Sequence, residues 1–368
     1  MLSDSDLSPQ ALDRATALPA SCYVDADGMA LDRREVFARS WQLVAHASRL
    51  STAGDHVVAE IAGVPLVVVR STDGVLRALH NVCRHRAGPL ATCDGRGARN
   101  LTCRYHGWTY GLDGQLLRAP DMHGASGFDP ASIRLPEARI GEWQGLVFAA
   151  LDDVVPLAQV LDGIERRLGA IRLSDYAFEQ RVDYDIACNW KVYVDNFLEG
   201  YHLPLVHPEL NRLLDYRSYT TETGAWHSLQ SSPIDDTDGP YGKGEALYFF
   251  LWPNVMLNIL PGRMQVNRVI PLEAGRCRVQ FDYCYAPGER GAANTAALRD
   301  EDRTFSDLVQ RQDIAICERV QCGLASGSYR AGRLNPRREN GVHHFHELLR
   351  AAYRARDRAH RPSRRESK

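Results

Sequence analysis

Residues 81–110, NVCRHRAGPLATCDGRGARNLTCRYHGWTY, contain two short cysteine–histidine pairs. Cys83 and His85 form a Cys-x-His pair, and Cys103 and His106 form a Cys-x-x-His pair after 17 intervening residues. Each pair is followed by a nearby glycine, which is typical of a turn. An isolated Cys-x-x-His is often a buried thiol beside a core histidine, but two such pairs rarely arise by chance. Four such ligands on two facing turns indicate one tetrahedral zinc ion or one two-iron cluster.

The sequence around these pairs predicts a small, loop-rich β domain over residues 41–150. Short β-branched runs alternate there with turns that contain glycine, proline or aspartate. The expected strands are 57–61, 65–69, 76–79 and 146–149. The preceding residues, 1–40, are an irregular start with a short helix near 32–40.

The sequence after residue 150 predicts a second domain, over 151–353, that mixes helices and strands. Periodic apolar patterns predict helices at 160–171, 190–202 and 298–322. Apolar runs between them predict strands at 246–260, 264–271 and 277–285. The final segment, 354–368, carries seven Lys or Arg and two acidic residues. It is expected to be a basic, disordered tail.

The composition is that of an ordinary globular protein and excludes several classes. The 44 Lys and Arg nearly balance 46 Asp and Glu, so the formal net charge is −2, and no large positive field would attract nucleic acid. The start, MLSDSDLSPQ, is unlike a secretory signal, and the most apolar runs are too short to span a membrane. A soluble, cytoplasmic protein is expected. Its nine cysteines favour free thiols and a metal site over a disulfide framework.

The segment 189–208, NWKVYVDNFLEGYHLPLVHP, carries a second group of possible metal ligands. On a continuous helix over 190–202, Glu199, His202 and a second carboxylate would share one stripe. Such a stripe is costly to bury unless its groups pair or bind a metal. His207 would point away from this helix, and the prolines of the segment are expected to end the helix and turn His207 back.

Two histidines need a carboxylate to complete the three-ligand face that ferrous oxygenases use. The helix expected at 298–322 offers candidates for this third ligand. Its residues at 314, 317 and 320 have the spacing of a core stripe, and Asp313 lies directly beside that stripe. Glu318 is the alternative, but it falls on the charged face of the helix.

These motifs resemble those of Rieske non-haem iron oxygenases, in the family's order along the chain. CRHRAGPL and CRYHGW are similar to the Rieske [2Fe–2S] motif, D-N-x-x-E-x-Y-H-x-x-x-x-H at 195–207 resembles the iron-binding segment, and Asp313 matches the late aspartate ligand. The resemblance implies an α+β fold of the helix-grip type. A small all-β Rieske domain is inserted before an α+β catalytic domain, whose antiparallel sheet packs on helices. Residues 1–40 are then expected to pack on the catalytic domain.

The resemblance assigns two metal centres to seven residues. The implied [2Fe–2S] cluster ligands are Cys83, His85, Cys103 and His106. The implied ligands of a mononuclear Fe(II) are His202, His207 and Asp313. Respiratory-chain Rieske proteins carry an extra cysteine in each loop, paired as a disulfide, whereas Gly88 and Tyr105 hold those places here. Cys93 lies between the motifs and is interpreted as structural.

The resemblance also implies a head-to-tail homotrimer, in which an electron passes from the cluster of one subunit to the mononuclear iron of its neighbour. A carboxylate bridges a histidine of each centre, and Glu199 matches that carboxylate, with Asp195 and Asn196 as alternatives. The cluster end of the bridge is assigned to His106, with His85 second. No glycine-rich phosphate loop follows a strand in this sequence, so electrons are expected from a separate NAD(P)H-dependent reductase or ferredoxin.

The substrate is expected to be a small organic molecule that reacts with O₂. Glu199, the chain length and the closing segment GRLNPRRENGVHHFHELLR (332–350) resemble the oxygenases of quaternary ammonium compounds such as choline, carnitine, glycine betaine and stachydrine. An aromatic cage would bind such a cation. The candidate cage residues are Trp226, Tyr241, Tyr248, Phe250 and Trp252, most of which could equally be core residues. A ring-hydroxylating oxygenase of an aromatic acid is the main alternative. A Rieske electron carrier and a structural zinc protein are more remote.

Overall fold

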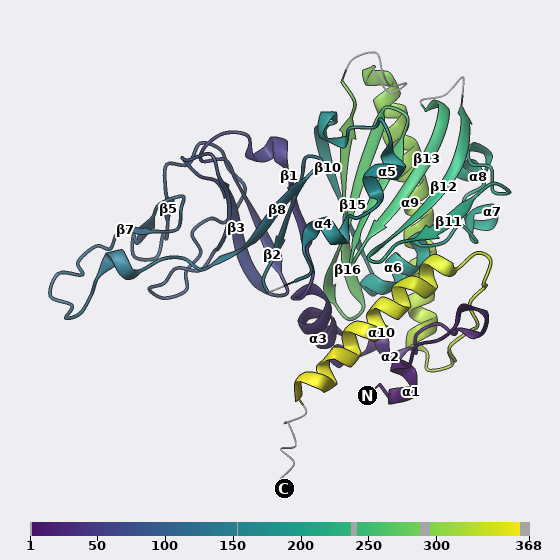
Figure 1. Ribbon diagram of the computed structural model, residues 1–368, viewed down its shortest axis with the longest axis horizontal. Helices are drawn as coiled ribbons and strands as arrows, with labels where there is room; N and C mark the ends of the chain where they lie inside the picture. Colours follow the sequence, from purple (N-terminus) through teal and green to yellow (C-terminus); the bar gives the residue numbers. More distant parts are fainter. Residues whose placement is uncertain (1, 153, 237–240, 288–294, 361–368) are drawn as a thin grey trace, which may run out of the picture. The chain divides into compact units, whose positions relative to one another are not determined.

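The structure is a computed structural model that describes residues 2–152, 154–236, 241–287 and 295–360 (Figure 1). It contains two compact units. One is continuous, Phe37–Val155, and the other combines Met1–Val36 with Pro156–Lys368. Along the sequence, the first unit is therefore an insertion in the second. None of the described helices is long and apolar enough to cross a bilayer.

The continuous unit is built from two antiparallel sheets and short helical turns. Its six-stranded sheet has the order β1 (Gln42–His46), β9 (Leu146–Ala150), β8 (Glu137–Trp143), β4 (Leu76–His80), β3 (Val64–Arg70), β2 (His56–Ile61). Its three-stranded sheet has the order β5 (Leu101–Thr102), β6 (Thr109–Tyr110), β7 (Leu116–Arg118). The 3₁₀ turns are η3 (Ala47–Leu50) and η4 (Pro130–Ser132).

Strand β3 is buried on both of its faces. Val67 and Val69 belong to the core that includes the three-stranded sheet, whereas Leu66 and Val68 belong to the core on the opposite face. A strand covered on both sides needs apolar side chains at consecutive positions. That need explains the unbroken apolar run in this part of the sequence.

The other unit is centred on a seven-stranded antiparallel sheet. Its strand order is β10 (Ala177–Ile186), β16 (Arg276–Tyr285), β15 (Arg263–Glu273), β14 (Val255–Leu260), β13 (Gly242–Leu251), β12 (His227–Asp236), β11 (Thr220–Thr223). Its longer helices are α6 (Trp190–Phe197), α9 (Ala296–Ala325) and α10 (Asn340–His360). Its shorter helices are α1 (Asp4–Leu7), η1 (Leu12–Arg14), α2 (Ser21–Val24), α3 (Ala26–Leu31), η2 (Asp32–Phe37), α4 (Leu157–Val160), α5 (Ile164–Leu168), η5 (Leu173–Asp175), α7 (Leu203–Val206) and α8 (Pro208–Leu213).

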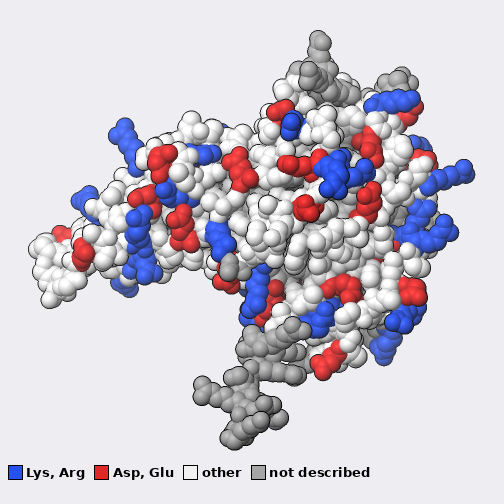
Figure 2. All heavy atoms as spheres, in the orientation of Figure 1, with Lys and Arg blue, Asp and Glu red and all other residues white. Residues whose placement is uncertain are grey.

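The three longer helices pack on this sheet and on one another. Helix α6 contacts β15, β16 and α9, while α10 contacts β11 and β12. The N-terminal helices α1 and α2 contact α10 and α9, so the first residues belong to this unit. The predicted α+β fold, an all-β domain inserted before an antiparallel sheet packed on helices, is confirmed. Acidic and basic side chains are interspersed over the face shown in Figure 2, in keeping with their nearly equal numbers.

Three predicted segments outside the metal-ligand region differ in the structure. The single strand expected at 246–260 is a hairpin, because the chain turns between β13 and β14 and the two strands pair antiparallel. The helix expected at 160–171 is broken into α4 and α5, because Gly163 adopts a φ of +87° between them. The tail expected from residue 354 is wrong for residues 354–360, because α10 continues through His360. Arg354 donates to the carbonyl of Leu7, which gives this part of the helix a partner in α1. Residues 361–368 lie outside the described residues.

A buried carboxylate, Asp32, ties the N-terminal segment to two helices. It accepts a hydrogen bond from Trp190 Nε1 at 2.8 Å and further ones from Lys191 Nζ and Tyr353 OH. Both side chains of the Asp32–Lys191 ion pair are fully buried. A buried ion pair adds little to stability by itself, but removing one partner leaves an uncompensated charge.

Replacing Asp32 by alanine is therefore expected to lower the free energy of unfolding by about 3–5 kcal/mol. Urea denaturation followed by tryptophan fluorescence measures the loss. The matched control is Asp27→Ala, an exposed carboxylate in the same segment, which should change stability by no more than about 0.5 kcal/mol. Equal effects of the two variants would contradict this role of Asp32.

Candidate metal centres

The two cysteine–histidine pairs lie on loops with the same backbone hydrogen bonds. In the first loop, the N–H of Ala87 donates to the carbonyl of Cys83, and the N–H of Cys83 donates to that of Gly88. In the second loop, the N–H of Gly107 donates to the carbonyl of Cys103, and the N–H of Cys103 donates to the carbonyl of Trp108. Ala87 and Gly107 both have a positive φ, of 56° and 73°. Two sequences with different ligand spacing therefore form one type of turn.

These loops bring the four predicted cluster residues together, and their side chains differ in exposure to solvent. Cys83 and Cys103 are buried, at 4% and 3% exposure, whereas His85 and His106 are exposed, with ring centroids 4.7 Å apart. Inner thiols and outer imidazoles fit a two-iron cluster.

Hydrogen-bond donors surround the two thiols. Burial raises the pKa of the Cys103 thiol, the nearby Cys83 raises it further, and the backbone N–H groups of Tyr105 and His106 oppose the rise. Tyr110 OH lies 3.4 Å from Cys83 Sγ. Thiolates that ligate a cluster can accept these donors, because they carry negative charge.

A glycine is required where the two loops meet. A Cβ atom on Gly88 would lie 2.8 Å from Cys103 Sγ, closer than real side chains approach. The position therefore leaves no room for the cysteine found at this point in respiratory-chain proteins. Cys93 is exposed and forms no disulfide.

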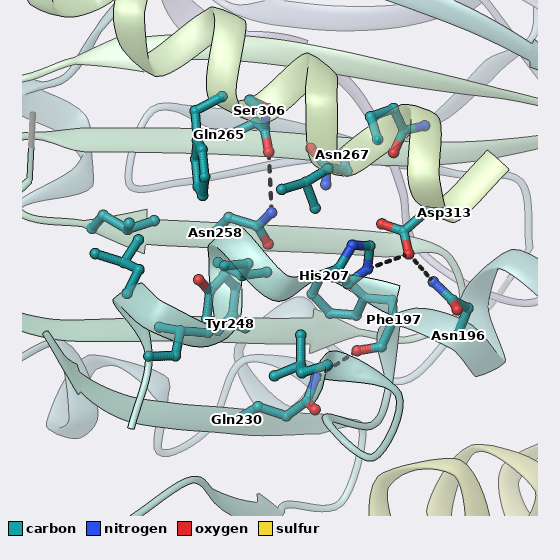
Figure 3. Close-up of a pocket in the computed structure, with 18 of the residues that line it drawn as sticks. Asn196, Phe197, His207, Gln230, Tyr248, Asn258, Gln265, Asn267, Ser306 and Asp313 are labelled. Atoms are coloured by element: carbon teal, nitrogen blue, oxygen red, sulfur yellow. Dashed lines mark hydrogen bonds and ion pairs between the residues drawn. The ribbon is translucent and has the colours of Figure 1, made fainter. Parts of the chain in front are cut away.

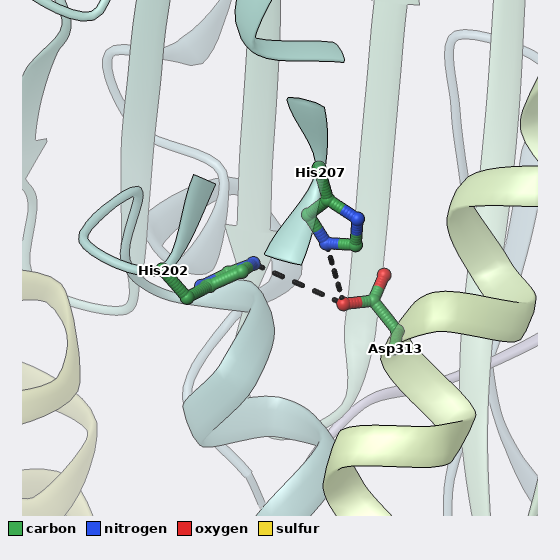
Figure 4. A group of neighbouring side chains, drawn as sticks. All are labelled: His202, His207 and Asp313. Atoms are coloured by element: carbon green, nitrogen blue, oxygen red, sulfur yellow. Dashed lines mark hydrogen bonds and ion pairs between the residues drawn. The ribbon is translucent and has the colours of Figure 1, made fainter. Parts of the chain in front are cut away.

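The second site joins His202, His207 and Asp313, whose ligand atoms lie within 4.8 Å of one another (Figure 4). Asp313 Oδ1 is 2.9 Å from His207 Nε2 and 3.8 Å from His202 Nε2. Burial opposes a charge on His207, but the hydrogen bond and charge of Asp313 raise its pKa above the ordinary value. Two imidazole nitrogens directed at one carboxylate form the donor set of a 2-His-1-carboxylate iron site.

Oxygen atoms on the far side of each imidazole fix how the rings face. His202 Nδ1 donates to Glu199 Oε1 at 2.6 Å, and His207 Nδ1 donates to Gln312 Oε1 at 2.7 Å. Both Nε2 atoms therefore face Asp313, and each would give up its proton there to ligate a metal. Asn196 Nδ2 donates to Asp313 Oδ1 at 2.6 Å. The sequence does not single out Gln312, because neighbouring residues on a helix point in directions about 100° apart.

The backbone around these histidines differs from the predicted continuous helix. Helix α6 ends at Phe197, so Glu199 and His202 lie in the turn that follows it and not on its stripe. The two prolines begin helices instead of ending one, because Pro204 and Pro208 occupy the first turns of α7 and α8. Proline is well suited to this position, where the helix needs no N–H donor.

One further prediction about this region needs correction, and two of the alternative site residues have hydrogen-bond partners of their own. The stripe expected on α9 is only partly core, since Cys317 is buried but Val320 is 44% exposed. Asp195, an alternative to Glu199, bonds to Tyr23 OH and His346 Nε2. Glu318, the alternative ligand, is not in the group of ligand atoms that contains the histidines, and it accepts a hydrogen bond from the N–H of Ala187.

A pocket of about 110 Å³ extends from the metal-ligand group between the sheet and α9 (Figure 3). Of the five predicted cage residues, Tyr241 and Tyr248 line it. Phe250 and Trp252 pack on Phe345 of α10 instead. Trp226 is likewise not among the described lining residues. The sequence did not single out the other aromatic residues that line the pocket, which are Tyr193, Phe197, Tyr219, Phe281 and Phe305.

Known proteins match both units. Residues 40–133 match the Rieske [2Fe-2S] domain, and residues 173–355 match the ring hydroxylating alpha subunit (catalytic domain). The chloroplastic choline monooxygenase of Arabidopsis thaliana is 34% identical over 92% of this chain and 83% of its own length. The carnitine monooxygenase oxygenase subunit of Escherichia coli K12 is 32% identical over 91% of this chain and 93% of its own.

Solved structures agree with these matches. A quaternary ammonium Rieske monooxygenase in complex with L-carnitine has a TM-score of 0.83 at 27% identity, over 94% of this chain and 99% of the other. Naphthalene 1,2-dioxygenase from a Rhodococcus species, at 17% identity and a TM-score of 0.76, shares the fold. The chain is therefore an oxygenase with a Rieske [2Fe–2S] cluster and a mononuclear iron, and it belongs to the ring-hydroxylating α-subunit family of Rieske non-haem iron oxygenases.

Proposed function

We propose that this chain is the oxygenase component that hydroxylates, and in doing so can N-demethylate, a small quaternary ammonium compound. The observation that supports this proposal most directly is the pocket beside His202, His207 and Asp313. Aromatic and aliphatic side chains make up most of its lining. Aromatic faces attract cations that carry no N–H donors, and a quaternary ammonium is such a cation. The likeness to choline and carnitine monooxygenases supports the same substrate class.

We assign the two metal centres to the residues that the loops and helices bring together. The cluster ligands are Cys83, His85, Cys103 and His106, and the mononuclear iron ligands are His202, His207 and Asp313. When bound, the metals supply one-electron transfer and the activation of O₂. The protein holds the imidazoles in one tautomer through Glu199 and Gln312, keeps the third carboxylate in place through Asn196, and encloses the substrate in the pocket.

Tyr110 is expected to influence the reduction potential of the proposed cluster. Its hydroxyl, beside Cys83 Sγ, stabilises the reduced and more negative cluster by donating to the sulfur. Tyr110→Phe is expected to lower the reduction potential by about 60 mV, equivalent to ~1.4 kcal/mol for a one-electron couple. Protein-film voltammetry measures this shift. Tyr105→Phe, on an exposed ring in the same loop region, is the control and should leave the potential unchanged.

We further propose a head-to-tail homotrimer that receives electrons from a separate NAD(P)H-dependent reductase or ferredoxin. His85 and His106 are exposed, as contact with another subunit requires. A second cavity, of about 710 Å³, lies on the catalytic unit and is lined by Glu199, His202 and Val320 among others. Docking of a partner's cluster loops there would cover the exposed Val320 and place Glu199 between the two centres.

A substrate screen with the purified protein tests the proposed function. The protein should be red-brown, with acid-labile sulfide, and a colourless zinc protein would refute the cluster. With a generic reductase and NADH, quaternary ammonium compounds should stimulate O₂ uptake, and N-demethylated ones should release formaldehyde. Stimulation by aromatic acids, with none by ammonium compounds, would make the chain a ring hydroxylase instead.

A further inference from the structure

Arg263, the first residue of β15, is a buried cation in the wall of the pocket. Its side chain is 6% exposed. It is the one Lys or Arg among the described residues that line the pocket. A pocket that binds an ammonium cation has no need of a second cation in its wall. This side chain therefore requires an explanation that the ammonium group does not provide.

The partner of Arg263 is Asp302 of α9, but the pair leaves most of the guanidinium unused. Nε lies 2.9 Å from Asp302 Oδ1, yet it forms no hydrogen bond of acceptable geometry. Asp302 also accepts from Tyr241 OH and Tyr285 OH, each at 2.8 Å. Each carboxylate oxygen of Asp302 thus already accepts from one tyrosine hydroxyl. No acceptor for the two terminal nitrogens of Arg263 is found among the described residues.

A second arginine of the same sheet shows what a purely structural pair looks like. Arg181 donates to both oxygens of Asp282, through Nε at 2.6 Å and Nη2 at 2.7 Å. That fork is complete without any ligand. A guanidinium carries five N–H donors, and burial without acceptors is unfavourable. Arg263 is thus short of acceptors, as a binding residue is before its ligand arrives.

The position of Arg263 relative to the metal ligands fits a small molecule that carries a different charged group at each end. Its partner Asp302 precedes the ligand Asp313 by 11 residues on α9, which is about 16 Å along the helix. Between them, Phe305, Ser306, Val309 and Gln310 line the pocket in successive turns. The pocket therefore has metal ligands toward one end and a cation toward the other.

Two aromatic rings of α6 complete this arrangement. Tyr193 and Phe197 lie on α6, the helix that also carries Asn196, which donates to Asp313. A cationic head among these rings would place its carbon atoms beside the metal ligands. Its tail would then extend toward Arg263, whose free N–H donors match a carboxylate in charge and in planar geometry.

We propose that Arg263 binds the carboxylate of the substrate, so that the preferred substrate is an ammonium carboxylate of the betaine type and not an ammonium alcohol. The inference rests on the proposed function and refines it. The known relatives do not decide this point, because their names include both an alcohol, choline, and a carboxylate, carnitine.

A panel of compounds that varies each charge separately tests the proposal. Glycine betaine and choline carry the ammonium with a carboxylate or an alcohol. Their carbon isosteres, 3,3-dimethylbutyrate and 3,3-dimethyl-1-butanol, lack the positive charge. A second set with three methylenes between the two ends allows for the length of the pocket. Dissociation constants are measured by titration calorimetry on the holoenzyme, and KM and kcat are measured in parallel.

The wild type should bind the ammonium carboxylates most tightly. Arg263→Gln should weaken the binding of both carboxylates by about 10- to 100-fold, the value of a hydrogen-bonded charge, and leave both alcohols within about threefold. The effect should fall on KM more than on kcat. Because Arg263→Gln leaves Asp302 without its cation, the double variant Arg263→Gln/Asp302→Asn repeats the measurement without a net change in buried charge. Arg181→Gln is the control for loss of an ion pair on the same sheet.

The outcomes separate this inference from the proposed function. Equal weakening of carboxylates and alcohols in the single and the double variant, or tighter binding of choline than of betaine by the wild type, would overturn the role of Arg263. Neither result would contradict an ammonium substrate. Carbon isosteres that bind as tightly as the ammonium compounds, with carboxylates still dependent on Arg263, would instead overturn the ammonium substrate and retain the carboxylate subsite.

Discussion

Replacing Asp313 by alanine is expected to remove the mononuclear iron and to reduce turnover by more than about 100-fold, while the Rieske cluster remains intact. Asp313 supplies the single carboxylate of the three-residue group, and two neutral imidazoles alone hold ferrous iron weakly. The cluster residues belong to the other compact unit and share no ligand with this site. Iron and sulfide analysis should show the loss of one iron per chain with unchanged sulfide.

A matched control for this experiment lies on the same helix. Asp307 is paired with Arg311 and accepts a hydrogen bond from Tyr184 OH, so it is a structural carboxylate of α9. Asp307→Ala should retain full iron content. Wild-type iron and turnover in the Asp313→Ala protein would show that another residue is the third ligand.

Replacing Glu199 by glutamine is expected to keep both metal centres and to slow turnover by about 100-fold or more. Glu199 Oε1 accepts from His202 Nδ1, and Oε2 accepts the N–H groups of Tyr201 and His202. Every one of these partners is a donor. A glutamine must direct its NH₂ group at one of them, so one contact changes from attractive to repulsive, and the bridge to the partner's imidazole is lost.

Single-turnover oxidation of the reduced cluster, with substrate and O₂ present, measures the effect of Glu199→Gln. Reduction of the cluster by the external donor should keep its wild-type rate, because that step does not involve the bridge. Glu318→Gln, which alters a carboxylate of α9 that accepts the backbone N–H of Ala187, is the control. Wild-type oxidation in Glu199→Gln would refute the bridge, and loss of iron would mean that Glu199 helps to hold the metal.

The sequence could single out the candidate metal-binding residues because the chemistry proposed for them depends on residue type and order. The Cys-x-His and Cys-x-x-His pairs each need only one local turn, and that turn forms from a few backbone hydrogen bonds. The path of the chain from Leu198 to Pro208 could not be read in the same way. Gly200 lies so close to Tyr219 that a Cβ would be 2.7 Å from its ring, and this contact joins residues that sequence periodicity does not relate.

The substrate pocket was harder to predict than the metal centres. Tyr248, Phe250 and Trp252 alternate along β13 and its end, so a strand pattern places them on one face. Only the packing of Phe345 from α10 decides that Phe250 and Trp252 are core while Tyr248 lines the pocket. Arg263 was missed for the same reason, because its partner Asp302 is on a different element and only tertiary structure joins them.

The bonds of Asp32 set the order in which this protein can be completed during synthesis. Tyr353, a hydrogen-bond partner of Asp32, follows it by 321 residues. At translation rates of about 5–20 residues per second, roughly 16 to 64 s pass between the synthesis of Asp32 and that of Tyr353. The inserted unit Phe37–Val155, which carries the cluster loops, is fully synthesised within that interval. Cluster assembly can therefore precede closure of the catalytic unit, and a chain that stops before α10 lacks the Tyr353 donor to Asp32 Oδ1.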